Sequence, residues 1–151
     1  MKDIFFQNED LYKTKFLACS LLFDRQICQT FNIVDLKGFS LSMWNKNTTR
    51  LVKFIAKLSQ DYYPEVMGKM VVCHAPVVVA GIWSIIKGWI DEKTRSKVSI
   101  HNSNYQKVLF EDCDPDQIPI SLGGSLESHI SEEFGPWSDY ELIDSSEPGA
   151  Q

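Results

Sequence analysis

The sequence predicts an α/β domain in which helices cover a largely parallel sheet. Amphipathic segments with helical spacing alternate along the chain with short apolar segments, and this alternation is typical of such a fold. The short segments are almost continuously apolar, as strands buried on both faces of a sheet are. The chain has 151 residues, 44% hydrophobic and 23% charged, which suffices for one domain with a substantial core.

The first half of the chain predicts two helices with a strand between them. Residues 8–29 carry apolar side chains at helical spacing, and Asn8 is suited to accept the first free N–H groups as an N-cap. Residues 31–36 are short, apolar and β-branched, which predicts a buried strand. Residues 47–65 form a second amphipathic segment, which Pro64 is expected to end.

The second half continues the alternation. We predict strands at residues 69–73, 97–100 and 118–122, and helices at residues 77–90 and 103–110. Pro76 ends the first of these strands, because proline has no N–H to donate to a sheet. Residues 125–151 are rich in Ser, Glu, Gly and Pro, so we expect them to be mostly irregular, with residues 138–151 as a flexible tail.

Residues 71–90 form a twenty-residue run that is apolar almost throughout, which raises the question of a membrane span. A span needs about 20 apolar residues in one helix. Pro76 interrupts the run and Lys87 precedes its end, so we expect a strand, a turn and a helix. That helix is apolar on nearly every side, so it is either fully buried or serves an apolar ligand or a membrane.

Composition excludes several classes of function. The formal net charge is −5 and no basic stripe is present, which argues against nucleic acid as the main partner. The four cysteines lack the spacing of a zinc site or a redox pair, so we expect free thiols and no metal. The first fifteen residues lack the apolar segment of a signal peptide, which favours a cytoplasmic location.

Few residues suggest chemistry. No G-x-S-x-G motif is present, so we predict no catalytic residue, and we interpret His74 as structural although it lies at a strand end. The loop at Gly123 and Gly124 lacks the lysine of a phosphate-binding loop and is interpreted as a turn that needs a positive φ.

Glu65, Thr94 and Lys97 are the residues best suited to hold a phosphate. A lysine and a hydroxyl three residues apart can both bind a phosphate, and a nearby carboxylate can position the lysine. The alternative is an ordinary pairing on a solvated surface, which contributes little. The residues by themselves leave both readings open.

Six segments in order carry a resemblance to a known family. They are NIVDLKGFSLS, YYPEVMGKMVVCHAP, SKVSI, NYQKVL, IPISLGG and GPW. The chain resembles the CRAL-TRIO lipid-binding domain, in particular its phosphatidylinositol/phosphatidylcholine transfer branch, from about Glu9 to Trp137, and we expect residues 1–137 to form this domain. The resemblance implies a mixed, mainly parallel sheet covered by helices around an apolar pocket for one phospholipid. It implies no covalent reaction and no cofactor besides the bound lipid.

The resemblance identifies the apolar helix as a gating helix, which closes over the lipid and opens on a membrane. Contact with the lipid or the membrane is expected from Val77, Ile82, Trp83, Ile86 and Trp89. Gly81 and Gly88 each weaken such a helix by ~1 kcal/mol relative to alanine, which suits a mobile lid. The expected location is therefore cytoplasmic with transient, peripheral membrane association.

The resemblance also places the headgroup contacts. It implies that Glu65, Thr94 and Lys97 hold an inositol phosphate, which makes phosphatidylinositol the expected ligand. Thr30 and Asn32 correspond to a second site for the phosphate of a choline lipid, where the family uses small hydroxyl residues. Asn32 departs from that pattern, so binding of phosphatidylcholine is less strongly implied.

The matched region begins after the helical N-terminal subdomain and first strand of the family. We therefore expect a partner chain or self-association to cover an open sheet edge. Two alternative functions remain: a lipid-independent interaction or scaffold protein, and a carrier of another hydrophobic ligand such as a sterol. An uncharged headgroup would leave Glu65, Thr94 and Lys97 without a ligand to bind.

Overall fold

The computed structural model describes residues 2–63, 65–127 and 135–138. The chain divides into two compact units. One contains residues 30–127 and holds the sheet, and the other combines residues 1–29 with residues 128–151.

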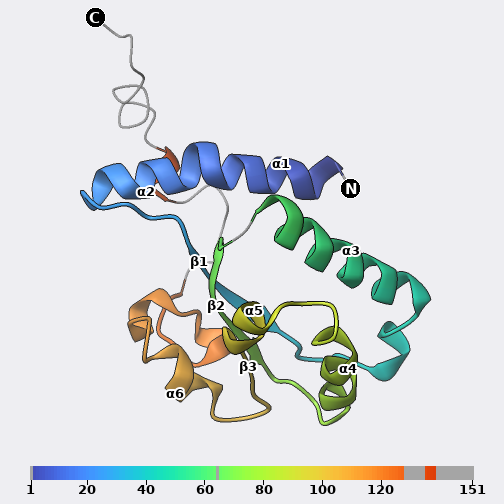
Figure 1. The fold of residues 1–151 in the computed structure, drawn as a ribbon. Coiled ribbons are helices and arrows are strands. Elements are labelled where there is room, and N and C mark those ends of the chain that lie inside the picture. The colour runs from blue at the N-terminus through green and yellow to red at the C-terminus, as the bar shows by residue number, and fades with distance from the viewer. Residues whose placement is uncertain (1, 64, 128–134, 139–151) are drawn as a thin grey trace, which may run out of the picture. The chain divides into compact units, whose positions relative to one another are not determined.

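The larger unit is built on a three-stranded parallel sheet in the order β1-β2-β3 (Figure 1). The strands are β1 (Thr30–Asp35), β2 (Met67–Cys73) and β3 (Val98–Ile100). Both strand pairs are parallel, so each connection must cross over the sheet, and helices occupy both crossovers. The predicted α/β fold with a mainly parallel sheet is confirmed.

The helix between β1 and β2 follows the prediction closely. It is α3 (Lys46–Tyr62), and it begins after Asn45, whose side chain accepts the N–H groups of Asn47 and Thr48. This cap satisfies two of the four N–H groups that a helix start leaves without a partner. Pro64, which we expected to end the helix, lies outside the described residues.

The connection between β2 and β3 contains two helices where the sequence predicted one. They are α4 (Val78–Ile86) and α5 (Glu92–Ser96). The predicted helix at residues 77–90 is therefore too long, because α4 ends before Gly88 and Asp91 caps a new helix by accepting the N–H of Thr94. The helix predicted at residues 103–110 is present as α6 (Tyr105–Leu109).

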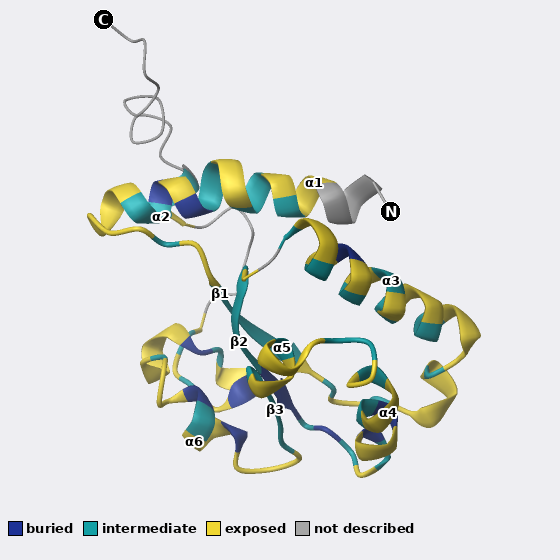
Figure 2. Cartoon of the chain, viewed as in Figure 1, coloured by how far each residue is buried: buried dark blue, intermediate teal, exposed yellow. Residues whose placement is uncertain are grey.

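Side chains of β2 alternate between two separate hydrophobic cores, one on each face of the sheet. The last three residues of β2 are buried, and buried positions are dark blue in Figure 2. Val71 and Cys73 belong to the core on the side of α6. Val72 belongs to the core on the side of α4. The first core also contains Tyr105, Leu109, Ile118 and Leu122, and the second also contains Ala75 and Val79. This period-2 division explains why β2 is apolar on both faces.

The strand predicted at residues 118–122 is wrong. Ile120–Leu122 forms a 3-10 turn, and a single bridge joins Pro119 to Leu126. Pro119 cannot donate to a strand ladder, and the apolar pattern reflects the burial of Ile118 and Leu122 against α6. Gly123 follows with φ +88, which confirms the predicted turn with a positive φ.

The smaller unit contains one helical stretch with different bounds from those predicted. It runs through α1 (Lys2–Asp10), a π-helical turn (Leu11–Lys15) and α2 (Phe16–Leu22). The predicted helix at residues 8–29 begins too late and ends too late, because Asn8 lies inside α1 and cannot cap its start. The helix ends at Leu22 rather than at residue 29. Beyond it, Ile27 donates its N–H to Ser20 Oγ at 2.9 Å.

A short 3-10 turn (Pro136–Ser138) completes the described part of this unit. Lys15 Nζ lies 5.4 Å from the centre of the Trp137 ring, within reach of a cation–π contact. Of the predicted flexible tail at residues 138–151, all but Ser138 lies outside the described residues.

The apolar run at residues 71–90 is divided between the end of β2, a turn, α4 and the turn that follows it. Among the residues that the structure describes, no helix has both the length and the apolar character that a membrane crossing requires. The predicted division into strand, turn and helix is confirmed.

Two glycines should respond in opposite directions to a single methyl group. A Cβ on Gly124 would overlap the backbone carbonyl of Ile118, whereas a Cβ on Gly81 in α4 meets no atom within 4 Å. Gly124→Ala should therefore lower the free energy of unfolding by about 1–3 kcal/mol, and Gly81→Ala should raise it by ~1 kcal/mol. Urea denaturation measures both, and equal shifts would contradict the predicted packing.

Candidate functional site

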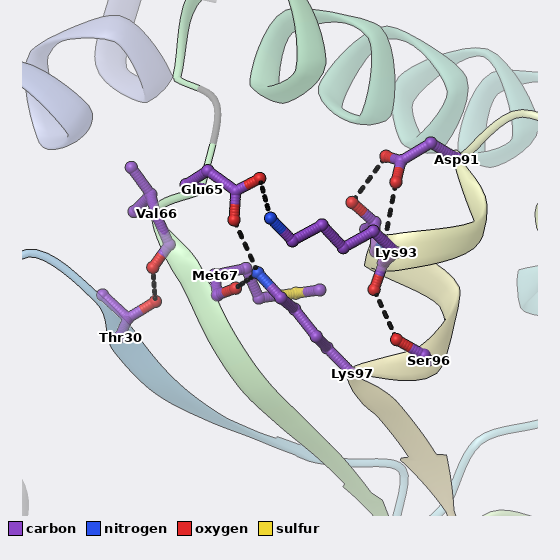
Figure 3. Close-up of polar contacts among 9 residues, drawn as sticks. Thr30, Glu65, Val66, Met67, Asp91, Lys93, Ser96 and Lys97 are labelled. Carbon is purple, nitrogen blue, oxygen red and sulfur yellow. Dashed lines mark hydrogen bonds and ion pairs between the residues drawn. The ribbon is translucent and has the colours of Figure 1, made fainter.

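Three charged side chains meet where β2 and β3 begin (Figure 3). Glu65 lies just before β2, Lys97 lies just before β3, and Lys93 belongs to α5. The Oε1 atom of Glu65 lies 2.7 Å from Lys93 Nζ, and its Oε2 atom lies 3.2 Å from Lys97 Nζ. The expected proximity of Glu65 and Lys97 is present, and Lys93 is an additional member of the cluster.

Lys93 could have been found from its spacing. It stands four residues before Lys97, and residues separated by four positions share one side of a helical turn. We did not predict a helix at residues 92–96, and without a helix a spacing of four residues gives no reason to place Lys93 beside Lys97. We refer to Glu65, Lys93 and Lys97 together as the two-lysine cluster.

The two lysines differ in their surroundings. The Lys97 side chain is only 18% exposed, and its Nζ also donates to the carbonyl of Met67 at 2.8 Å. An ammonium has three N–H groups, so one of them remains after the bonds to Glu65 and Met67. The Lys93 side chain is 67% exposed. Lys97 is therefore held in place by the protein, while Lys93 extends into solvent.

Thr94 lies in the same helix but its hydroxyl bonds elsewhere. Thr94 Oγ1 donates to Asp91 Oδ2 at 2.6 Å, and its backbone N–H donates to Asp91 Oδ1 at 2.8 Å. These two bonds hold the pKa of Asp91 below its usual value, and the bond from the Thr94 hydroxyl has the larger effect. The carbonyl of Thr94 accepts the N–H of Lys97 at 3.2 Å, so the structure joins Thr94 to the cluster through the backbone.

Glu65 has an unusual backbone for a residue with a side chain. Its φ is +66, in the left-handed region that costs a non-glycine residue free energy. Hydrogen bonds from Lys93 first and from Lys97 second hold the pKa of Glu65 below its usual value. The carboxylate is thus ionised and shared between two ammonium groups.

The second predicted headgroup pair lies at the start of β1. Thr30 Oγ1 donates to the carbonyl of Val66 at 3.3 Å and accepts from Asn32 Nδ2 at 2.9 Å. Val66 immediately follows Glu65 in the chain, so the bond from Thr30 to the Val66 carbonyl connects the two predicted sites (Figure 3). The structure places both groups at the amino-terminal edge of the parallel sheet.

A different hydrogen-bonded group occupies the carboxyl-terminal edge. His74 Nδ1 lies 2.7 Å from Asp35 Oδ1, and His74 Nε2 lies 2.7 Å from the Tyr105 hydroxyl. Burial opposes ionisation of Asp35, but hydrogen bonds from His74 and the Lys37 N–H leave its pKa below the usual value. The adjacent Cys73 thiol is buried, which raises its pKa to about 11, so it is not a thiolate nucleophile near neutral pH.

The predicted gating residues lie in α4 and beyond both of its ends: Val77 immediately precedes the helix and Trp89 follows it. Val79 and Ile82 are buried, whereas Val77 is 87% and Ile85 is 50% exposed. The remaining three predicted contacts are half-buried: Trp83, Ile86 and Trp89. The apolar side chains of this segment therefore lie in two environments, some in the protein core and others in solvent.

Gln60 of α3 holds the segment that follows α4. Its Nε2 donates to the carbonyl of Trp89 at 2.9 Å, and its Oε1 accepts the N–H of Asp91 at 3.2 Å. Lys53 Nζ lies 5.8 Å from the centre of the Trp89 ring. Trp89 is thus outside α4 and is attached to α3.

The shared carboxylate makes a testable prediction for pH. Lys93→Gln should raise the pKa of Glu65 toward its usual value of 4.5, because the first cause of the lowered pKa is removed. A lowered pKa contributes stability that is present above 4.5 and lost as pH falls through the pKa of the folded state. In the variant the pKa of the folded state lies closer to 4.5, so less stability should be lost and the loss should be complete at a higher pH.

Carboxyl carbon chemical shifts, followed by NMR during an acid titration, measure the Glu65 pKa directly. Arg95→Gln is the matched control, since it removes the same charge from the same helix. An unchanged Glu65 pKa in Lys93→Gln would contradict the ion pair.

Comparison with known proteins identifies the family of the chain. The model of the CRAL/TRIO domain matches residues 8–124. The chain is 34% identical over 140 residues to the Sec14 cytosolic factor of Schizosaccharomyces pombe, which covers 91% of this chain and 49% of that protein. It is 31% identical over 140 residues to the phosphatidylinositol/phosphatidylcholine transfer protein SFH7 of Arabidopsis thaliana, which covers 89% of this chain and 26% of that protein.

The chain also resembles a solved structure, the crystal structure of Sfh5, with a TM-score of 0.60 at 22% identity. This similarity covers 70% of the chain and 37% of that structure, and it concerns the fold. The chain thus spans from about a quarter to a half of the length of the relatives named here. Because the family model matches most of the chain, the chain belongs to the CRAL/TRIO domain family.

Proposed function

We propose that the chain binds a phospholipid, with phosphatidylinositol as the preferred ligand, and presents or transfers it at a membrane surface. The observation that carries this proposal is the two-lysine cluster, in which two ammonium groups converge on one carboxylate at the edge of the sheet. Relatives named for phosphatidylinositol/phosphatidylcholine transfer support the choice of ligand. The Schizosaccharomyces pombe relative is named a cytosolic factor, which supports a cytoplasmic location.

The cluster suits a phosphate for electrostatic reasons. Hydrogen bonds between an ammonium and a phosphate oxygen are short and about twice as strong as neutral ones. Lys97 is held by Glu65 and Met67 with one N–H remaining, so little side-chain freedom is lost when a ligand binds. Thr94 can add a hydroxyl donor if its bond to Asp91 is exchanged for one to the ligand.

Acyl chains would lie against the apolar face of the sheet that α4 covers. Val72 and Val79 form the centre of the core on this face. Partly buried Val34, Met70, Val98 and Ile100 pack around them. Opening of α4 would expose this apolar surface, and the outward side of α4 would meet the bilayer.

The second predicted headgroup site supports phosphatidylcholine less well. The Thr30 hydroxyl and the Asn32 amide are bonded to one another and to backbone carbonyls. A choline phosphate would have to displace these internal bonds. We therefore propose phosphatidylcholine as a secondary ligand, and no covalent step for any bound lipid.

Removal of the Lys97 ammonium should reduce loading of phosphatidylinositol. Lys97→Met keeps an apolar stem of similar length, and loss of one charge-assisted hydrogen bond corresponds to roughly a ten- to hundredfold loss of affinity. Native mass spectrometry after incubation with mixed vesicles measures the bound lipid. Lys107→Met on the exposed side of α6 is the control and should load normally.

Equal losses of phosphatidylinositol and phosphatidylcholine in Lys97→Met would indicate a folding defect. A wild-type chain that remains free of lipid under these conditions would overturn the proposed function and favour the lipid-independent scaffold.

Exposed apolar residues in α4 and immediately before it should support vesicle binding. Val77→Ser with Ile85→Ser replaces two apolar side chains that are 87% and 50% exposed, so the fold should remain intact while membrane partitioning weakens several-fold. Ile120→Ser, at another exposed apolar residue of the same unit, is the matched control. Vesicle co-sedimentation that falls equally in the control would contradict a specific role for α4.

A further inference from the structure

The two-lysine cluster contains more positive than negative charges. One carboxylate, Glu65, is in direct contact with two ammonium groups, those of Lys93 and Lys97. The lowered pKa of Glu65 supports its ionised form, so the three groups together carry one positive charge. Without Lys93 the remaining pair would be neutral, and a bound phosphodiester would leave a net negative charge beside the sheet.

The positions of the two lysines divide their roles. Lys97 has little exposed surface and two protein acceptors, so it acts as a fixed donor. Lys93 is mostly exposed, and Glu65 Oε1 is the acceptor that the structure gives it. Its long side chain can move from Glu65 onto a ligand oxygen without breaking a second bond, because a lysine ammonium is a flexible point charge.

We infer that Lys93 is the specificity-determining residue of the headgroup site, and that it supplies the one positive charge that balances the single negative charge of an inositol phosphodiester. This inference rests on the proposed function and deepens it. A zwitterionic choline headgroup brings no net charge to be balanced. Loading of phosphatidylcholine therefore does not depend on Lys93.

Arg95 offers a matched control for this inference. It lies in the same helix, is also exposed and carries the same charge. Within the described part of the chain, the ion pairs of Glu65 are with Lys93 and Lys97. Loss of Arg95 therefore changes the net charge and the attraction to anionic vesicles as much as loss of Lys93, but leaves the two-lysine cluster intact.

The experiment compares the full chain with Lys93→Gln, Lys93→Arg and Arg95→Gln. Each protein is incubated with vesicles of equal phosphatidylinositol and phosphatidylcholine, and the ratio of the two bound lipids is measured by native mass spectrometry. We expect Lys93→Gln to lower this ratio by about tenfold or more, the effect of one charged hydrogen bond. Lys93→Arg should restore it, and Arg95→Gln should leave it within about twofold of wild type.

Each other outcome has a distinct meaning. If Lys93→Gln retains the wild-type ratio, or if Arg95→Gln lowers the ratio equally, the inference is wrong while the proposed function stands. If the wild-type chain loads neither lipid, the proposed function itself fails. If glycerophosphoinositol, the deacylated headgroup, binds with the same dependence on Lys93 and the lipid does not load, the ligand is the soluble phosphodiester and a lipid site is excluded.

Discussion

The central strand of the parallel sheet is the constraint on which the rest of the larger unit depends. β2 pairs with a strand on each side, so its backbone groups are used in the sheet and its side chains must be buried on both faces. Val71 and Cys73 enter one core while Val72 enters the other. Both α4 and α6 find their apolar partners on this strand, and a shift of one residue would exchange the two cores.

Parallel pairing also separates two groups of polar side chains. All three strands begin at the same edge, where Glu65 and Lys97 precede β2 and β3 and Thr30 begins β1. The strands end at the opposite edge, where Asp35, His74 and Tyr105 form a hydrogen-bonded chain. Ligands of open α/β sheets generally bind at the carboxyl-terminal edge, yet the cations suited to a phosphate lie at the amino-terminal edge.

The helix α4 connects the core to the proposed membrane surface. Ile82 is buried while Val77 and Ile85 are exposed, so movement of α4 away from the sheet would uncover an apolar face. The bond between Gln60 and the carbonyl of Trp89 holds the end of this connection to α3. The opening that we propose for α4 would therefore be held back more at Trp89 than at Val77.

The sequence by itself determined the α/β fold, the parallel strands and the break at Pro76. The reason is that a continuous run of apolar residues and a missing proline N–H are local properties of the chain. The segment at residues 118–122 shows the limit of such reasoning. Its apolar residues are buried by α6, and burial alone does not distinguish a strand from a turn. The capping of α5 by Asp91 likewise depends on a short helix that periodicity cannot detect.

For the site, sequence indicated Glu65 and Lys97, whose ion pair the structure contains. Only the tertiary structure decided that Lys93 shares the same carboxylate and that the Thr94 hydroxyl bonds to Asp91. The physical reason is that a hydrogen bond forms over about 3 Å in space, whereas Glu65 and Lys93 are separated by 28 positions along the chain. Their contact exists because β2 and β3 begin at the same edge of one parallel sheet.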